Sequence, residues 1–171
     1  LQDVAIEYER FERSRRDDEQ ARTIAMVDAL ATQLRGELEA NAASIDVAHI
    51  HGASSSAVQE IVSAILKEHL GFDEEVVLTH EDGILARPRP DFFFRLGPGE
   101  GVIAEVERGG TVTNNHDLKD IWKAHIAPDV QHLFLIVPNA NWREDGTARE
   151  RPFVRVAHRL GAFFGDARRE I

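Results

Sequence analysis

The spacing of apolar residues between positions 54 and 137 changes several times, and these changes constrain the fold most. Stretches with helical spacing alternate with short β-branched or apolar runs bounded by Pro and Gly. In chain order, we expect a helix from the Ser54–Ser56 cap to about residue 70, strands at 75–79, 91–96 and 101–107, a helix at about 115–126 and a strand at 132–137. The second and third strands would form a hairpin, and the apolar run at 132–137 predicts a strand buried on both faces. The sequence therefore predicts an α/β domain.

Two further helical segments flank this core. Residues 1–40 lack Pro and are rich in good helix formers. Their apolar residues recur at three- and four-residue steps, at Ile24, Val27, Leu30, Leu34 and Leu38. Pro152 opens a C-terminal helix, and residues 139–151 before it read as a polar loop. We expect residues 1–48 to be a helical appendage or dimer arm and residues 49–171 to be the α/β domain. The amphipathic helix favours a homodimer, in which its apolar stripe would be buried.

Composition excludes several classes of protein. The chain is 43% apolar and 29% charged, as in ordinary globular domains. It has no cysteine, which excludes disulfides and thiolate zinc sites and is compatible with a reducing cytosol. No apolar run approaches the length of a membrane span, and no signal peptide is visible. We expect a cytoplasmic protein without a membrane segment.

The formal charge of -10 is distributed unevenly. Residues 1–40 hold ten acidic and six basic residues, and residues 41–80 hold six acidic residues and only Lys67. Residues 81–171 hold 14 acidic and 13 basic residues. The acidity therefore belongs mainly to the first 80 residues, and the C-terminal half remains compatible with a phosphate-bearing partner.

Four carboxylates stand out by their positions. Asp91 follows Pro90 at a strand start, and Glu105 and Glu107 lie two apart on the next strand, so alternation directs them to one face. Glu60 lies in the helix before the strands and could add a fourth carboxylate. Adjacent like charges need a positive partner, and a divalent cation such as Mg²⁺ would supply it. The competing interpretation is an exposed strand face whose acidic residues meet cross-strand partners.

The order of elements, with Pro90-Asp91 followed by Glu105-Val106-Glu107, resembles the PD-(D/E)xK nuclease superfamily, which has the restriction-endonuclease-like fold. The resemblance covers roughly residues 54–137 and implies an αβββαβ core with a mixed central sheet flanked by helices. It implies Asp91 and Glu105 as metal ligands, Glu60 as the acidic residue of the first core helix, and Mg²⁺ as cofactor, with Mn²⁺ able to substitute. The usual motif lysine is replaced by Glu107, as in some type II restriction enzymes, where Glu-x-Glu serves as the motif.

Because the motif lysine is missing, positive charge must come from elsewhere. Lys119 and Lys123 share one face of the predicted helix at 115–126 and are candidates, although a solvated helix face would look the same. Arg108 could contact phosphate or form a surface ion pair, and His116 is a weaker candidate for a substrate contact. Glu107 could act as a general base or hold a second metal.

Two functions from different classes remain open. The first is a Mg²⁺-dependent endodeoxyribonuclease that hydrolyses phosphodiester bonds in DNA. The alternative is a catalytically inactive nucleic-acid-binding or assembly module on the same fold, which the missing lysine and the acidic N-terminal half favour.

Overall fold

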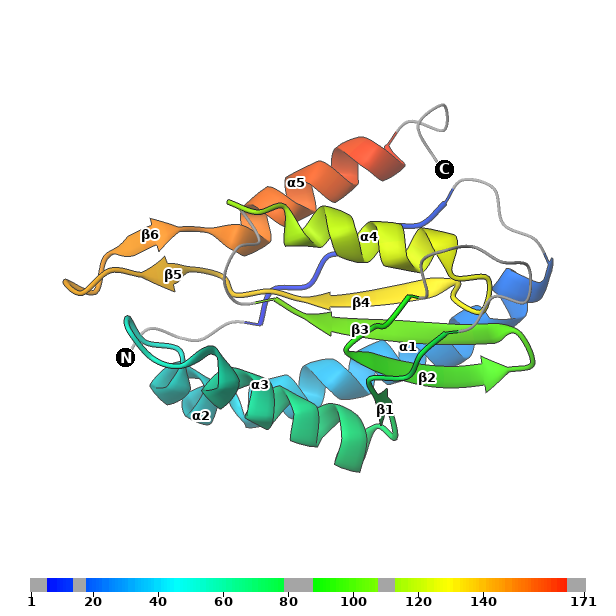
Figure 1. The fold of residues 1–171 in the computed structure, drawn as a ribbon, viewed down its shortest axis with the longest axis horizontal. Coiled ribbons are helices and arrows are strands. Elements are labelled where there is room, and N and C mark those ends of the chain that lie inside the picture. Colours follow the sequence, from blue (N-terminus) through cyan, green and yellow to red (C-terminus); the bar gives the residue numbers. More distant parts are fainter. Residues whose placement is uncertain (1–5, 14–17, 79–87, 108–112, 166–171) are drawn as a thin grey trace.

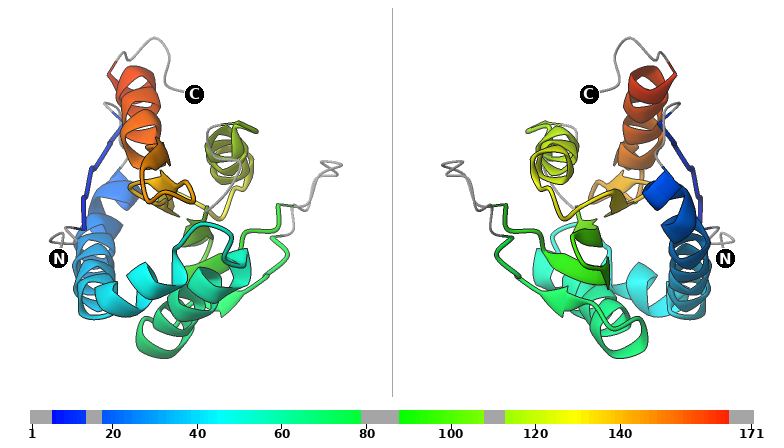
Figure 2. Two further views of the ribbon diagram at one scale, coloured as in Figure 1. Left: turned by 90° about the vertical axis from the view of Figure 1, so that its left-hand side faces the viewer. Right: turned by 90° about the vertical axis from the view of Figure 1, so that its right-hand side faces the viewer.

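The fold was analysed in a computed structural model, which describes residues 6–13, 18–78, 88–107 and 113–165 (Figure 1). In chain order, its elements are α1 (Asp18–Ala40), α2 (Ala42–Ala48), α3 (Ser55–Ala64), the π-helical turn η1 (Ile65–His69), β1 (Asp73–Glu74), β2 (Phe92–Gly97), β3 (Glu100–Val106), α4 (His116–Ile126), β4 (His132–Ile136), β5 (Asn141–Trp142), β6 (Ala148–Glu150) and α5 (Pro152–Phe164). Helices cover both faces of a central sheet, with α4 and α5 on one face and α1 to α3 on the other (Figures 1 and 2).

The central sheet is mixed and has the strand order β1-β2-β3-β4. Strands β2 and β3 form the predicted antiparallel hairpin, and β4 runs parallel to β3, which requires the crossover through α4. Gly101 is required in the hairpin, because a Cβ there would lie 2.4 Å from the ring of Phe93. The α/β class and the mixed sheet flanked by helices are confirmed.

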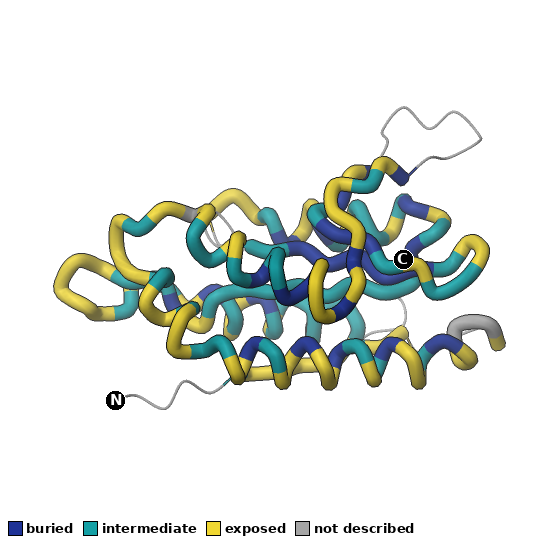
Figure 3. The backbone as a smooth tube through the Cα atoms, turned by 90° about the horizontal axis from the view of Figure 1, so that it is seen from below, coloured by how far each residue is buried: buried dark blue, intermediate teal, exposed yellow. Residues whose placement is uncertain are grey.

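Helix α1 contributes to the main core. Along α1, buried positions recur between exposed ones, as Figure 3 shows in the view from below. Val27, Leu34 and Leu38 belong to the same buried cluster as Leu66 of η1 and Phe92 of β2. The apolar stripe of α1 is thus buried within its own chain, which removes the reason for expecting a homodimer through this helix. The homodimer itself stays a prediction.

Three details differ from the sequence prediction. The strand expected at 75–79 is replaced by the two-residue β1, because Glu75 has a left-handed backbone with φ of 52° that ends the strand, while Thr79 lies outside the described residues. Strand β4 is only half-buried throughout, since it is the edge strand of the sheet and not a central one. The region 139–151, expected as a loop, contains the β5–β6 hairpin.

Candidate functional site

Asp91 and Glu105 lie side by side at one end of the β2–β3 hairpin. Phe92 pairs with Ala104, so the residues on either side of this pair, Asp91 and Glu105, become neighbours. The Val106 N–H donates to Asp91 Oδ2 at 3.1 Å, and the Asp91 N–H donates to Glu105 Oε2 at 3.3 Å. Asp91 is half-buried and Glu105 is fully buried. The local geometry therefore brings together two of the carboxylates that the sequence singled out.

Helix α4 adds a lysine and a third carboxylate to this pair. The Lys123 ammonium donates to Glu105 Oε1 at 2.6 Å and lies 3.0 Å from Asp120 Oδ1. Asp120 is buried, and its Oδ2 has no hydrogen-bond partner among the described residues. We define Asp91, Glu105, Asp120 and Lys123 as the carboxylate cluster. The sequence prediction missed Asp120; its only local signal is the three-residue spacing to Lys123.

Burial makes the charged forms of the acidic residues in this cluster unfavourable. Burial raises the pKa of Glu105 to about 7, although the hydrogen bond from Lys123 opposes the shift. Burial also raises the pKa of Asp120 to about 6, with Lys123 again opposing. For Lys123, burial acts to lower the pKa, but the hydrogen bond to Glu105 and the charge of Asp120 raise it above its ordinary value. The single positive charge of Lys123 thus faces three carboxylates. Such an excess of negative charge favours the binding of a cation or of protons.

Glu107 lies just after β3 and turns toward the start of α4. Its Oε2 is 2.9 Å from Nδ1 of His116, the first residue of that helix. The charge of Glu107 is also among the causes that raise the pKa of Asp120, so Glu107 acts electrostatically on the cluster. Glu107 and His116 therefore form a polar pair beside the carboxylate cluster.

A buried ion pair fixes α4 to α5. Arg159 donates through Nη1 to both carboxylate oxygens of Asp117, at 2.8 and 3.0 Å, and through Nη2 to the side chain of Asn115 at 3.0 Å. Asp117 is completely buried. Asn115 occupies the N-cap position of α4, but it has a left-handed backbone with φ of 53° and makes no side-chain cap bond. Arg159 thus fixes the first turn of the helix that carries Lys123.

The other predicted site residues lie apart from the cluster or outside the described residues. Glu60 is exposed on α3, where it lines a shallow hollow with Lys67 and Glu74. Lys119 is exposed on α4, with no role in the contacts of the cluster. Arg108 lies outside the described residues. The structure therefore brings together Asp91, Glu105 and Lys123, but not Glu60 or Lys119.

The chemistry of the cluster suits a divalent cation, although its geometry as it stands is not that of a metal site. Within residues 6–13, 18–78, 88–107 and 113–165, no three His, Asp or Glu side chains are arranged to hold a metal ion. The donor set is nevertheless all-oxygen, as Mg²⁺ prefers, and the buried Asp120 Oδ2 has no partner. Asp91, Glu105 and Asp120 are the residues that would hold the cation.

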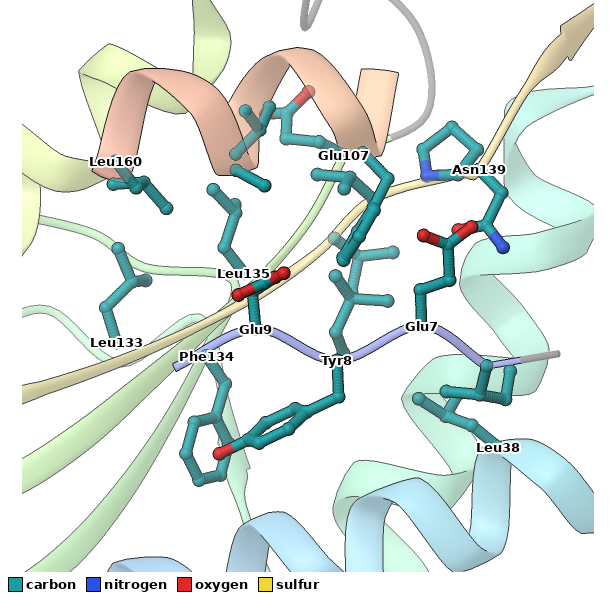
Figure 4. Close-up of a pocket in the computed structure, with 18 of the residues that line it drawn as sticks. Glu7, Tyr8, Glu9, Leu38, Glu107, Leu133, Phe134, Leu135, Asn139 and Leu160 are labelled. Atoms are coloured by element: carbon teal, nitrogen blue, oxygen red, sulfur yellow. The ribbon is translucent and has the colours of Figure 1, made fainter. Parts of the chain in front are cut away.

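A large groove runs beside this region, between β4, α5, α1 and the outer side of α4 (Figure 4). Its volume is about 1880 Å³, and Glu107 is among its lining residues. Leu133 and Leu135 of β4 point toward Leu160 of α5, while Phe134 points to the opposite side (Figure 4). The groove therefore lies against the half-buried edge strand.

The outer side of α4 faces this groove and corrects the prediction for that helix. The helical spacing of the sequence predicts that Leu118 and Trp122 face the core and that His125 is hydrogen-bonded beside them. Trp122 is 57% exposed, Leu118 is 47% exposed and His125 is exposed. The helix buries its acidic side because Arg159 and Lys123 compensate the charges there.

Comparison with known proteins adds no family. No protein-family model, no curated protein and no solved structure matches this chain. Among the described residues, no helix is both long and apolar enough to cross a lipid bilayer.

Proposed function

We propose that this protein is a Mg²⁺-dependent nuclease that hydrolyses phosphodiester bonds in DNA, on a restriction-endonuclease-like core. The observation that carries the proposal is the position of Lys123. Its ammonium reaches the buried Glu105 from α4, beside Asp91, and so supplies from a helix the positive charge that the strand motif lacks at Glu107. A divalent cation held by carboxylates, with a lysine nearby, can support metal-dependent hydrolysis of a phosphodiester bond.

Each residue has a distinct role in this proposal. Asp91, Glu105 and Asp120 bind the cation, which when bound lowers the pKa of a coordinated water and neutralises developing charge. Lys123 stabilises negative charge on the phosphate. Glu107, whose carboxylate lies 2.9 Å from His116 Nδ1, accepts a proton at its carboxylate. Arg159 positions α4 through Asp117 without contacting the substrate.

Cleavage of circular DNA tests this function. Purified protein is incubated with supercoiled and linear DNA in Mg²⁺, in Mn²⁺ and in chelator. We expect metal-dependent nicking or cutting that is lost in Asp91→Asn and retained in Glu60→Gln, a matched carboxylate on the distant α3. Cleavage that survives Asp91→Asn would refute the site assignment.

The ion pairs of Lys123 also favour a second candidate function. Because Lys123 is already paired with both Glu105 and Asp120, the cluster could be a structural ion-pair network in a catalytically inactive nucleic-acid-binding or assembly module. This candidate predicts DNA binding or assembly without hydrolysis, and no tight Mn²⁺ binding by calorimetry. Saturable Mn²⁺ binding that depends on Glu105 would exclude it.

A further inference from the structure

We propose that the groove between α4 and α5 binds a single-stranded polynucleotide, with an unpaired base stacked on Trp122 and phosphates near the cations of both helices. This rests on the proposed function, because it names the form of substrate that the carboxylate cluster meets. Two independent features of the same two helices support it: the sign of their exposed charges and an exposed aromatic stripe.

The exposed charges of α4 and α5 are opposite in sign to the charge of the whole chain. The chain carries -10, yet the acidic residues of α4, Asp117 and Asp120, are both buried, and α5 has no acidic residue. The exposed ionic side chains are Lys119 on α4, Arg155 on α5 and Arg151 at the start of α5; Arg151 lines the groove, and the other two lie on the same helices outside its lining. Among the described residues, no carboxylate pairs with any of these three cations. This surface therefore suits a polyanion.

The aromatic stripe lies on the groove side of α4. Leu118, Trp122 and His125 follow one another at helical spacing, and the rings of Trp122 and His125 are 5.7 Å apart. All three line the groove and all are exposed. A flat exposed ring beside cations is the platform on which unpaired bases stack. The bases of a duplex already stack on one another, so their faces are closed to such a platform.

The groove extends from this platform to Glu107, which lies beside the carboxylate cluster, although none of the four cluster residues lines it. Glu107, Arg151 and Arg159 line the same groove as Trp122. Lys123, the next residue after Trp122, reaches Glu105 at 2.6 Å. Since successive helix residues point about 100° apart, a base on Trp122 leaves its own phosphate close to the Lys123 side of α4. A bound strand thus presents its backbone to the cluster.

Acidic side chains also line the groove, and most of them lie on walls other than α4. Glu12 lies in the segment 6–13, Asp28 on α1, Asp46 on α2 and Glu144 between β5 and β6, while Glu107 lies beside α4 and is paired with His116. Glu7 and Glu9 project from the extended segment 6–13, which runs between α5 and α1, away from α4 (Figures 2 and 4). Repulsion from these carboxylates confines a polyanion to the side formed by α4 and the first turns of α5. The distribution of charge therefore defines one path for the strand.

Binding without metal tests the inference separately from catalysis. Labelled single strands of about 12 nucleotides, DNA and RNA, and a duplex of the same length are titrated in chelator, with fluorescence anisotropy as readout. We expect single strands to bind at least about tenfold more tightly than the duplex. Trp122→Ala should weaken single-strand binding about tenfold, while Trp122→Phe keeps most of it.

Charge variants provide the second arm. Lys119→Gln and Arg155→Gln should each reduce the salt dependence of binding by about one unit of slope, whereas Lys67→Gln on the distant η1 should not. Equal or tighter duplex binding, no effect of Trp122→Ala, or a Trp122→Ala effect on self-association instead would overturn the inference. Single-strand binding without cleavage in Mg²⁺ would support the binding groove and refute the proposed nuclease function. Duplex cleavage that does not depend on Trp122 would support the nuclease function and refute the binding groove.

Discussion

The ammonium of Lys123 lies 2.6 Å from the carboxylate of Glu105, joining two residues that are 18 positions apart in the chain. This contact ties the helix α4 to the end of β3 and places the only positive charge of the cluster against its most buried acid. Asp91 and Asp120 adjoin Glu105. We therefore expect protons, the Lys123 ammonium and a bound cation to compete for the same carboxylates.

Removing the lysine should separate catalysis from folding. Lys123→Met leaves Glu105 and Asp120 without their partner, and we expect cleavage to fall by about 100-fold or more because charge stabilisation is lost. Lys119→Met, a matched change on the exposed side of the same helix, should lower activity only through weaker binding. Steady-state cleavage rates at saturating DNA distinguish the two. Equal losses in both variants would contradict the role given to Lys123.

Stability should depend on pH through the buried acids. The pKa of Glu105 is raised from 4.5 to about 7 and that of Asp120 from 3.8 to about 6, so the folded state binds protons that the unfolded state releases. This contribution is fully present below pH 4 and is lost as pH rises toward 7. Asp120→Asn should therefore be more stable than wild type by about 1–3 kcal/mol at pH 8, but not at pH 4.

Denaturant unfolding at both pH values provides the measurement for Asp120→Asn. The exposed Asp46 of α2 offers the control, since Asp46→Asn should change stability little at either pH. An Asp120→Asn variant that is less stable than wild type at pH 8 would show that its pairing with Lys123 outweighs its burial.

The ion pair between Asp117 and Arg159 should be essential for stability. Arg159→Gln leaves a fully buried carboxylate without its cation and should cost about 3–5 kcal/mol in the free energy of unfolding. Arg155→Gln, one turn away and exposed, should cost less than about 0.5 kcal/mol. The double variant Asp117→Asn with Arg159→Gln should recover part of the loss, and a loss as large as in the single variant would contradict this account.

Helix α1 should behave as part of the core. Leu34 is buried in the main cluster, so Leu34→Ala should destabilise the protein by about 2–5 kcal/mol through a cavity. Met26 on the same helix is 50% exposed, and Met26→Ala should have a small effect. Thermal or denaturant unfolding compares the two. Similar small effects for both would show that α1 is an appendage after all.

The contrast between the hairpin and α4 shows what the sequence could predict. Period-two alternation and the Pro and Gly boundaries were sufficient to predict the β2–β3 hairpin, because hairpin pairing is local, and in that hairpin Asp91 lies beside Glu105. In α4, Leu118 and Trp122 are four residues apart and Asp117 and Asp120 are three apart, so both pairs have helical spacing and lie on roughly opposite sides of the helix. Which stripe faces inward depends on charges supplied from outside the helix.

Those compensating partners are remote in the chain. Arg159, which pairs with Asp117, lies 42 residues further on, and no local pattern reveals that contact. The burial of β4 was overestimated for a related reason: an apolar run indicates a buried strand, but only the strand order shows that β4 is at an edge. Long-range pairing, and not periodicity, determined both outcomes.

Calorimetric titration of Mn²⁺ at pH 8 into the wild-type protein and into Glu105→Gln tests whether the carboxylate cluster binds a divalent cation. This pH is above the raised pKa values of Glu105 and Asp120, so both carboxylates are ionised and protons do not compete with the cation. We expect saturable binding of Mn²⁺ to the wild type and its loss in the folded variant. Absence of binding to the wild type, or equal binding to both proteins, would contradict it.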